Sequence, residues 1–291
     1  VTGVSTYGHD IGGYQSATNE VTSKETFFRW ASLAAWSPVM RTHHGTQPST
    51  YPGMDPPRNQ DQWRWDTDAE TIDHFRAYAT LHMALVPLFE GLAKVAADTG
   101  VPIWRGLFMA YPQDEAVWPL LDEVMVGDGL LEGEWYPWSG GAAVAGGATV
   151  DALAPLGDIP VFARAGAVVP TFPDGVMTLV NSSPEVPGPE IVGDDRVVYV
   201  FLGGSGSFVE KGGLAYSMAQ AADITGALSF SWGGAAIAAC ADPVVAPCVE
   251  GLADRDVVHV AGPGELVITG QGGSATFSAE GGAADRALTV V

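Results

Sequence analysis

The distribution of tryptophan divides the chain into two parts of different composition. Eight of the nine tryptophans lie between Trp30 and Trp138, and the remaining one is Trp232. Beyond Trp138 the sequence is rich in Gly, Ala and Val, and short apolar runs such as VFARAGAVV, DRVVYVFLG, DVVHVAGPG and GELVITG are broken by Gly, Pro and Asp. Such runs are typical of β-strands separated by turns. We therefore predict β-sandwich structure for the second part, in one or two domains that meet near Gly204.

The first part contains one strongly periodic segment. From Phe75 to Val95, apolar side chains recur every three or four residues, which is the spacing of one face of an α-helix. The tetrapeptide Thr67-Asp68-Ala69-Glu70 has the form of a capping box and should start this helix, and Gly100 with Pro102 should end it. Because proline removes a backbone donor, Pro87 should kink the helix.

Around this helix the first part follows the order of a parallel α/β unit. A strand is expected over residues 4–7 with Asp10 at its end, then a helix over residues 24–36, and then a second strand that finishes at Val39-Met40. Two strands separated by a helix normally lie parallel in one sheet. The expected fold class is therefore α/β for the first part and all-β for the second.

The balance of charge excludes one class of partner. The chain has 13 basic and 34 acidic residues, and its formal net charge is −21. Proteins that bind phosphate backbones need clusters of Lys and Arg, so we expect no nucleic-acid partner. The acidic residues are scattered, which is typical of a solvated surface. No run approaches the roughly 20 apolar residues that span a bilayer, so no membrane span is expected.

The start of the chain does not have the pattern of a signal peptide. No basic segment is followed by an apolar run, and the opening VTGVSTYG has the composition of a strand already in progress. We therefore expect that further sequence precedes Val1.

Two cysteines, Cys240 and Cys248, are separated by ADPVVAP. A loop of this size can close as a disulfide, and without a third thiol or a nearby histidine no metal site is indicated. We expect this disulfide. A disulfide favours an oxidising compartment, so the expected location is secreted or periplasmic.

Polar residues follow both predicted strands of the first part, where α/β folds gather functional side chains. The stretch HDIGGY carries Asp10 and Tyr14, and the stretch MRTHHGT carries Arg41, His43 and His44. Each stretch also has a purely structural interpretation. An Asp before two glycines is commonly a turn residue that bonds its own backbone. Adjacent histidines point in different directions, so they do not indicate a metal site.

Several motifs of this chain, taken in order, resemble those of glycoside hydrolase family 31, the α-glucosidase family. The motifs of that family are D-I-G-G-F, E-x-x-x-R-W and P-x-x-R-x-H. Here they are Asp10-Ile-Gly-Gly-Tyr14, Glu25-Thr-Phe-Phe-Arg29-Trp30 and Pro38-Val-Met-Arg41-Thr-His43. The resemblance covers about the first 140 residues and continues through Leu81-His82-Met83, Gly100-Val-Pro102, Arg105-Gly-Leu-Phe108 and Gly133-Glu134-Trp135-Tyr136.

This resemblance implies a fold and a division into domains. Residues 1–123 would form the C-terminal part of a (β/α)8 TIM barrel, with HDIGGY at the end of its seventh strand and MRTHH at the end of its eighth. Residues 124–204 would form a proximal β-sandwich domain and residues 205–291 a distal one. The proximal domain would be shortened by about one hairpin after Leu131.

The resemblance also implies a function, a retaining α-glycoside hydrolase that acts on terminal α-linked sugars in carbohydrate metabolism. By carry-over, Asp10 and His43 would bind hydroxyls of the sugar, Tyr14 would take the place of a pocket phenylalanine, and Arg41 would hold the loop. Trp30 is assigned a structural role. The family's nucleophile and acid/base lie on earlier strands, so we expect no catalytic residue in this chain and no turnover by the chain alone.

Further expectations follow from the same chemistry. The substrate would be an oligosaccharide or a small α-glycoside, and no metal or organic cofactor is implied because the chemistry proceeds on carboxylates. The sugar, its linkage, the choice between hydrolysis and transglycosylation, and the oligomeric state stay open. The alternative is a non-catalytic carbohydrate-binding or structural β-sandwich protein in which the first part is a helical cap.

Overall fold

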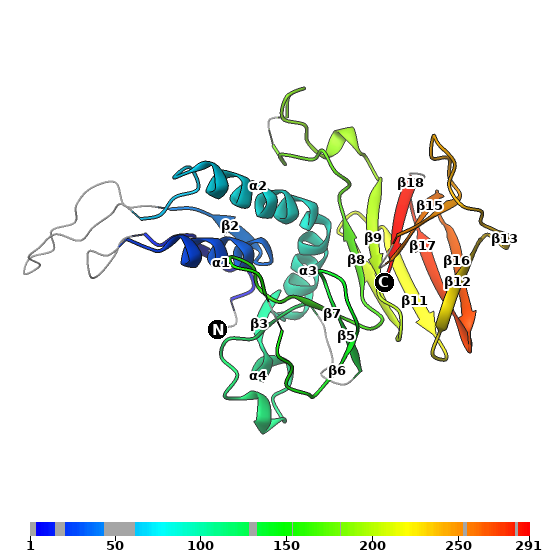
Figure 1. Cartoon of the computed structure of the whole chain (residues 1–291), viewed down its shortest axis with the longest axis horizontal. Helices are drawn as coiled ribbons and strands as arrows, with labels where there is room; N and C mark the ends of the chain where they lie inside the picture. The colour runs from blue at the N-terminus through cyan, green and yellow to red at the C-terminus, as the bar shows by residue number, and fades with distance from the viewer. Residues whose placement is uncertain are drawn as a thin grey trace, which may run out of the picture. The chain divides into compact units, whose positions relative to one another are not determined.

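The computed structural model describes residues 4–14, 21–43, 62–127, 133–152, 154–180, 182–252, 255–282 and 285–291 (Figure 1). The chain divides into two compact units. The first unit comprises Val1–His82, Val95–Asp128 and Ala152–Pro160, and the second comprises Met83–Lys94, Gly129–Asp151 and Val161–Val291. Each unit is described separately below.

The first unit contains short strands and most of the helical structure. Its elements are β1 (Gly8–Asp10), α1 (Lys24–Ala35), β2 (Val39–Arg41), α2 (Ala69–Ala84), the end of α3 (Val86–Thr99), β3 (Trp104–Gly106), α4 (Leu107–Ala110), η1 (Glu115–Val117) and β4 (Val124–Val126). Strands β1 and β2 pair in parallel, and β3 and β4 pair antiparallel. The predicted parallel α/β arrangement is therefore confirmed.

Strand β1 lies later in the sequence than predicted. It covers Gly8–Asp10 instead of residues 4–7, and Gly8 pairs with Val39 at the start of β2. Pro38 directly precedes β2 and has no backbone N–H, so the parallel pairing does not extend before Val39. Asp10 nevertheless ends its strand, as predicted.

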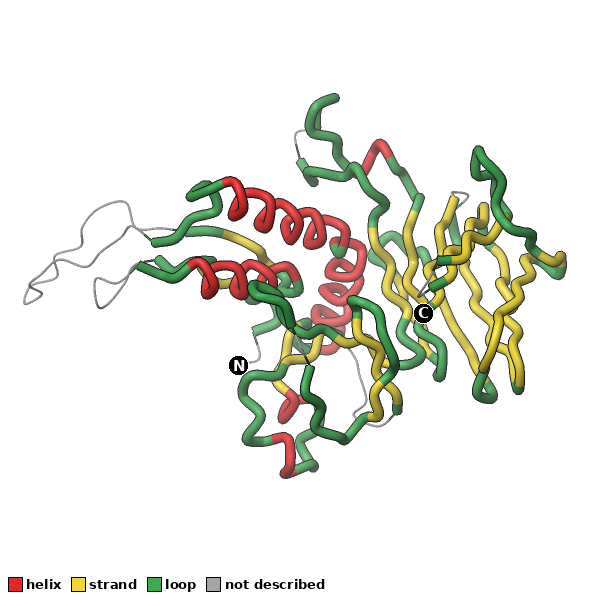
Figure 2. Tube along the Cα trace, in the orientation of Figure 1, coloured by secondary structure: helices red, strands yellow, loops and turns green. Residues whose placement is uncertain are grey.

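Helix α1 forms the core of the first unit with the turn after β1. Ser23 is its N-cap and accepts a hydrogen bond from the Thr26 backbone N–H, which satisfies a free donor of the first turn. Phe27, Phe28, Ala31 and Ala34 lie on its buried face and pack around Ile11, which has no exposed surface. Figure 2 shows α1 and α2 as separate red coils.

The predicted long helix is present, but it is broken into two. Asp68, rather than Thr67, caps α2 by accepting a hydrogen bond from the Thr71 backbone N–H. Hydrogen bonds from Lys24 and from Thr71 lower the pKa of Asp68 to about 2. Because Pro87 cannot donate a backbone hydrogen bond, it lies in the first turn of α3, and α2 and α3 meet at a bend of 52°.

The second unit is built mainly of strands. They are β5 (Glu134–Pro137), β6 (Val144–Ala145), β7 (Phe162–Arg164), β8 (Val168–Thr171), β9 (Arg196–Val200), β10 (Gly206–Val209), β11 (Ala215–Gln220), β12 (Thr225–Trp232), β13 (Ala235–Ala236), β14 (Cys248–Gly251), β15 (Asp256–Ala261), β16 (Gly264–Gln271), β17 (Gly273–Glu280) and β18 (Asp285–Val290), with the 3-10 helix η2 (Pro189–Ile191) before β9. The four apolar runs singled out in the sequence all contain strands.

Two sheets of the second unit share one hydrophobic core. One sheet has the order β10-β11-β17-β16-β12-β13, and the other has the order β14-β15-β18-β9-β8. Tyr216, Leu266 and Phe277 of the first sheet pack with Val198 and Leu288 of the second in a single buried cluster. Two sheets facing one core form a β-sandwich, as predicted for this part of the chain. A third, small sheet has the order β6-β5-β7.

Strands from both sides of the predicted domain boundary at residue 204 belong to the same sheet. Strand β9 pairs in parallel with β18, so Arg196 lies opposite Arg286. The division into domains at 123/124 and 204/205 stays a prediction. The shortening after Leu131 also stays a prediction, because residues 128–132 lie outside the described residues.

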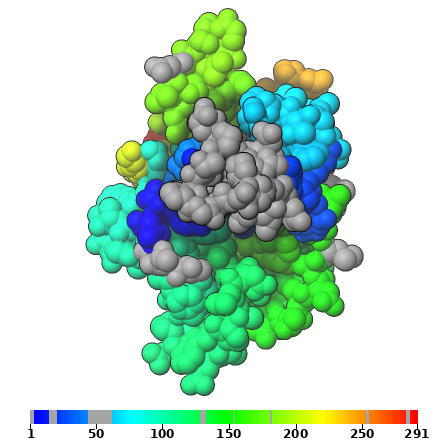
Figure 3. Space-filling model, turned by 90° about the vertical axis from the view of Figure 1, so that its left-hand side faces the viewer, coloured from blue at the N-terminus to red at the C-terminus, as the bar shows by residue number. Residues whose placement is uncertain are grey.

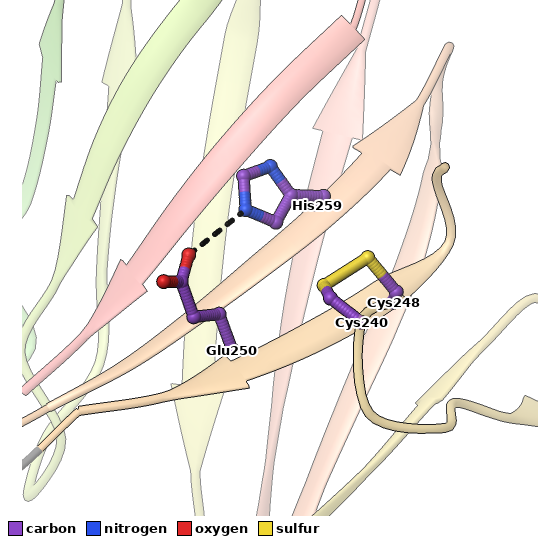
Figure 4. The surroundings of a disulfide bond; sticks show 4 residues. All are labelled: Cys240, Cys248, Glu250 and His259. Atoms are coloured by element: carbon purple, nitrogen blue, oxygen red, sulfur yellow. Dashed lines mark ion pairs between the residues drawn. A yellow bond between two sulfur atoms is a disulfide. The ribbon is translucent and has the colours of Figure 1, made fainter. Parts of the chain in front are cut away.

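A disulfide joins Cys240 to Cys248, as their spacing predicts. Figure 4 shows it beside strand β14. An ion pair lies nearby, in which Oε2 of Glu250 in β14 is 3.8 Å from Nε2 of His259 in β15. The disulfide fixes the segment that leads into β14, the edge strand of its sheet.

No single helix among the described residues has both the length and the apolar character needed to cross a bilayer. The bent pair α2 and α3 meets those two requirements only when the helices are taken together.

Candidate functional site

The candidate site lies where β1 and β2 end. Asp10 is the last residue of β1 and lies opposite Arg41, the last residue of β2. After Asp10 the chain turns sharply, and the Gly13 backbone N–H donates to the Asp10 carbonyl at 2.7 Å. Gly12 and Gly13 have φ angles of 85° and 87°, and a Cβ on Gly12 would lie 2.7 Å from the Trp63 carbonyl oxygen. The double glycine is therefore required by this turn.

Arg41 holds the Asp10 carboxylate. Its Nε and Nη2 groups both donate to Asp10 Oδ1, the first at 2.9 Å. The other carboxylate oxygen, Oδ2, accepts no hydrogen bond from the described residues and lies 3.8 Å from His43 Nδ1. The Asp10 side chain is 25% exposed, and Oδ2 keeps its capacity to accept hydrogen bonds.

His43 and Tyr14 lie beside this carboxylate. Arg41 Nη2 lies 3.4 Å from His43 Nδ1. The Tyr14 ring contacts the His43 ring edge-on, with centroids 5.0 Å apart. The His43 side chain is 55% exposed and Tyr14 is 42% exposed. Figure 3 shows atoms of the first unit at the surface on the face turned to the viewer, with residues near the start of the chain in blue and later residues of the unit in cyan.

All four residues predicted for the substrate-binding site are thus brought together. Asp10 and Tyr14 come from the first stretch and Arg41 and His43 from the second, although 31 residues separate Asp10 from Arg41. His44 lies outside the described residues. The group offers a carboxylate oxygen, an imidazole N–H, a phenol and an aromatic face, which is a suitable set for a ligand that carries several hydroxyl groups.

One residue of the site was not predicted from the sequence. His9 lies directly before Asp10, and its Nδ1 accepts a hydrogen bond from Trp30 Nε1 at 2.6 Å. Burial lowers the pKa of His9, and the Asp10 charge offsets this only in part. His9 is therefore a neutral imidazole, anchored to α1, that fixes the strand carrying Asp10.

The His9 ring is part of an aromatic cluster. Trp104 lies with its ring centroid 6.5 Å from that of His9, and Tyr7 stacks on Trp104 at 5.5 Å. Side chains alternate across a strand, so His9 and Asp10 project to opposite faces of β1. This alternation is the sequence signal that could have assigned His9 to packing against a helix. The structural role predicted for Trp30 agrees with this bond.

Within the described ranges, no three or more His, Cys, Asp or Glu side chains form a group that could hold a metal ion. The two predicted disulfide residues, Cys240 and Cys248, belong to the second unit and take no part in the Asp10 group.

Comparison with known proteins agrees with the motif order. Residues 1–91 match the family model of the glycosyl hydrolases family 31 TIM-barrel domain. The chain is 33% identical over 183 residues to a sulfoquinovosidase of Escherichia coli strain K12, which covers 57% of this chain and 25% of the relative. It is 30% identical over 238 residues to a probable glucan 1,3-alpha-glucosidase of Arabidopsis thaliana, covering 70% of this chain and 24% of that protein.

The chain spans about a quarter of the length of these two relatives. Among solved structures, it is similar to a cycloalternan-forming enzyme from Listeria monocytogenes in complex with a pentasaccharide substrate, with a TM-score of 0.64 and 20% identity. That similarity covers 95% of this chain and 29% of the other, and it supports a TIM-barrel portion followed by β-rich structure. Residues 1–91 are thus similar to the TIM-barrel domain of glycosyl hydrolases family 31.

Proposed function

We propose that Asp10, His43 and Tyr14 form one wall of a sugar-binding subsite in a retaining α-glycoside hydrolase. The observation that carries this proposal is the Asp10 carboxylate, which has one oxygen held by Arg41 and the other available to a ligand. A carboxylate oxygen accepts hydrogen bonds from sugar hydroxyls, and the His43 imidazole can donate one. The Tyr14 ring adds an aromatic surface for the apolar face of the sugar.

Arg41 has a positioning role in this proposal. Its two hydrogen bonds to Asp10 Oδ1 fix the position of the carboxylate. A carboxylate paired in this way is well suited to accept hydroxyl hydrogen bonds. It is poorly suited to attack a sugar carbon or to carry a proton.

Retaining glycoside hydrolysis needs two carboxylates, a nucleophile and an acid/base, about 5–5.5 Å apart. Asp10 is the one carboxylate in the described group, and its two hydrogen bonds from Arg41 favour a role in binding. We therefore propose that both catalytic acids lie outside these 291 residues and that the chain alone has no turnover.

The substrate class is a terminal α-linked sugar of a small glycoside or oligosaccharide. The names of the relatives suggest glucosides and a sulfonated sugar as test substrates. Hydrolysis of 4-nitrophenyl α-glucoside, α-xyloside, α-galactoside and α-sulfoquinovoside by the complete gene product, and by the 291-residue chain, would test the proposal. We expect the gene product to cleave at least one substrate and the chain to cleave none.

The variant His43→Ala tests the wall directly. Loss of a polar contact to a bound hydroxyl should lower kcat/KM about tenfold or more. The matched control is His259→Ala, which removes a histidine of the second unit. Unchanged kinetics in His43→Ala would remove this residue from the site, and turnover by the chain alone would contradict the assignment of the catalytic acids.

We also propose a secreted or periplasmic location. The disulfide between Cys240 and Cys248 and the presence of only three lysines support it. Titration of the native protein with a thiol reagent should detect no free thiol, and two reactive thiols in protein isolated from its source would contradict the proposal.

A further inference from the structure

The second unit contains a pocket of about 480 Å³, within the range of small-ligand sites. The start of α3, the ends of β8 and η2, and the turns that follow β10 and β17 form its wall. The lining residues that bear on its chemistry are Glu90, Phe172, Asp194, Arg196, Glu210 and Lys211. None of its described lining residues belongs to the Asp10 group.

A buried ion pair makes one side of this pocket rigid. Arg196 and Glu210 are 9% and 5% exposed, and Arg196 donates to the Glu210 carboxylate from Nε and Nη2 at 2.8–3.0 Å. Arg196 Nη1 donates to the Gly193 and Asp195 carbonyls. A guanidinium has five N–H groups, so one Nη2 hydrogen keeps no acceptor among the described residues. The pair is therefore fixed and still has one donor available.

Spare donors and acceptors also lie at the mouth. Lys211 Nζ donates to Glu90 Oε1 at 3.0 Å, with side chains 66% and 48% exposed, so the ammonium keeps two hydrogens and the carboxylate keeps its second oxygen. Asp194 is exposed and forms no hydrogen bond or ion pair in the part of the chain that the structure describes. Donors and acceptors are thus both present.

The remaining lining is apolar or small. The Arg196 guanidinium lies 4.9 Å from the centroid of the Phe172 ring, and Pro87 and Leu179 line the same pocket. A Cβ placed on Gly212 would meet no atom within 4 Å. A side chain added at Gly212, which lines the pocket, would therefore meet no steric obstacle at its Cβ, and Phe172, Pro87 and Leu179 supply an apolar surface.

This combination suits a neutral ligand with many hydroxyl groups. Three acidic and two basic side chains line the pocket, so its charge selects neither cations nor anions. A hydroxyl can donate to Asp194 or Glu90 and accept from Lys211 or Arg196, and a sugar ring also has an apolar face. We infer that this pocket is a second sugar site, which binds a neutral mono- or disaccharide independently of the Asp10 group.

The test is a titration of the 291-residue chain with maltose and with isomaltose, followed by amide chemical shifts in NMR spectra. We expect saturable shifts of the Gly212, Gly213 and Gly282 amides. Lys211→Met and Asp194→Asn should each weaken this binding at least tenfold, and Gly212→Leu should abolish it by filling the pocket. The matched controls Lys94→Met and Asp151→Asn should leave it within twofold.

Two results would overturn the inference. One is the absence of shifts at these glycines with both disaccharides. Shifts of the same glycines with sulfate or calcium would then assign the pocket to an ion. The other is unchanged affinity in both Lys211→Met and Asp194→Asn. The titration is repeated with His43→Ala, in which the glycine shifts should persist. Failure of the proposed function would instead appear as an absence of sugar-induced shifts at Tyr14 and His43 in the unaltered chain.

Discussion

Two arginine–carboxylate pairs in this chain use the same groups in opposite ways. Arg41 and Asp10 have side chains 53% and 25% exposed, and one oxygen of Asp10 is unoccupied by described residues. Arg196 and Glu210 have side chains 9% and 6% exposed, and Tyr216 also donates to Glu210 at 2.7 Å. The exposed pair keeps bonding capacity for a ligand. The buried pair uses nearly all of its capacity within the sandwich, so burial decides which role such a pair has.

The substitution Arg196→Met should have the largest effect. It leaves Glu210 as a buried, unpaired charge, which costs about 3–5 kcal/mol of unfolding free energy. Urea denaturation followed by circular dichroism measures this loss. Adding Glu210→Gln to the variant should recover part of it, because the amide removes the charge and keeps an acceptor for Tyr216. A loss below about 1 kcal/mol in Arg196→Met would contradict the contrast between the two pairs.

Acidification should have an intermediate effect, and it should act on the first unit. Burial lowers the pKa of His9 and of His82 from 6.5. Both histidines are therefore neutral in the folded unit and gain protons more readily when it unfolds. Their contribution to stability is complete above pH 6.5 and declines as the pH falls towards their lower folded-state pKa values.

Six of the nine tryptophans belong to the first unit, so urea denaturation followed by tryptophan fluorescence at pH 7.5, 6.5 and 5.5 measures this decline. The His82→Gln variant should have a shallower dependence on pH in this range, since glutamine does not titrate. An equal slope in His82→Gln and the unaltered chain would rule out His82 as a source of the decline.

The substitution Arg41→Met should have the smallest effect on stability. An exposed ion pair contributes about 0–1 kcal/mol, so the denaturation curve should move little. The complete gene product should nevertheless lose about tenfold in kcat/KM, because Asp10 would no longer be held in position. If Arg41→Met destabilises the protein as much as Arg196→Met does, the distinction between the two pairs is wrong.

The elements that could be predicted are those that depend on neighbouring residues or on the order of strands and helices. The helix expected over residues 24–36 is α1, and Pro87 predicts the break between α2 and α3 because it lacks a donor. Asp10 and Arg41 meet because parallel strands end at one edge of their sheet, which the order of elements already implies. The bond between His9 and Trp30 was not predicted, because the motif begins at Asp10 and His9 projects from the opposite face of the strand.

The pocket of the second unit could not be predicted in the same way. Glu90, Asp194 and Lys211 come from a helix and two separate loops, and only the packing of the strands brings them together. The parallel pairing of β9 with β18 also has no local signal, since Arg196 and Arg286 are 90 residues apart. Contacts of this kind depend on the whole core, which no short motif encodes.

The position of β18 has a consequence for synthesis. Strand β18 lies between β15 and β9, and Leu288 and Val290 are almost completely buried. A ribosome adding about 5–20 residues per second needs roughly 5–18 seconds to extend the chain from β9 to β18. Throughout that interval one edge of β9 has no partner and the core is incomplete, and such an edge is prone to pair with other chains. The nascent protein therefore has a long period of exposure to aggregation, during which a chaperone that binds extended segments would have its greatest effect.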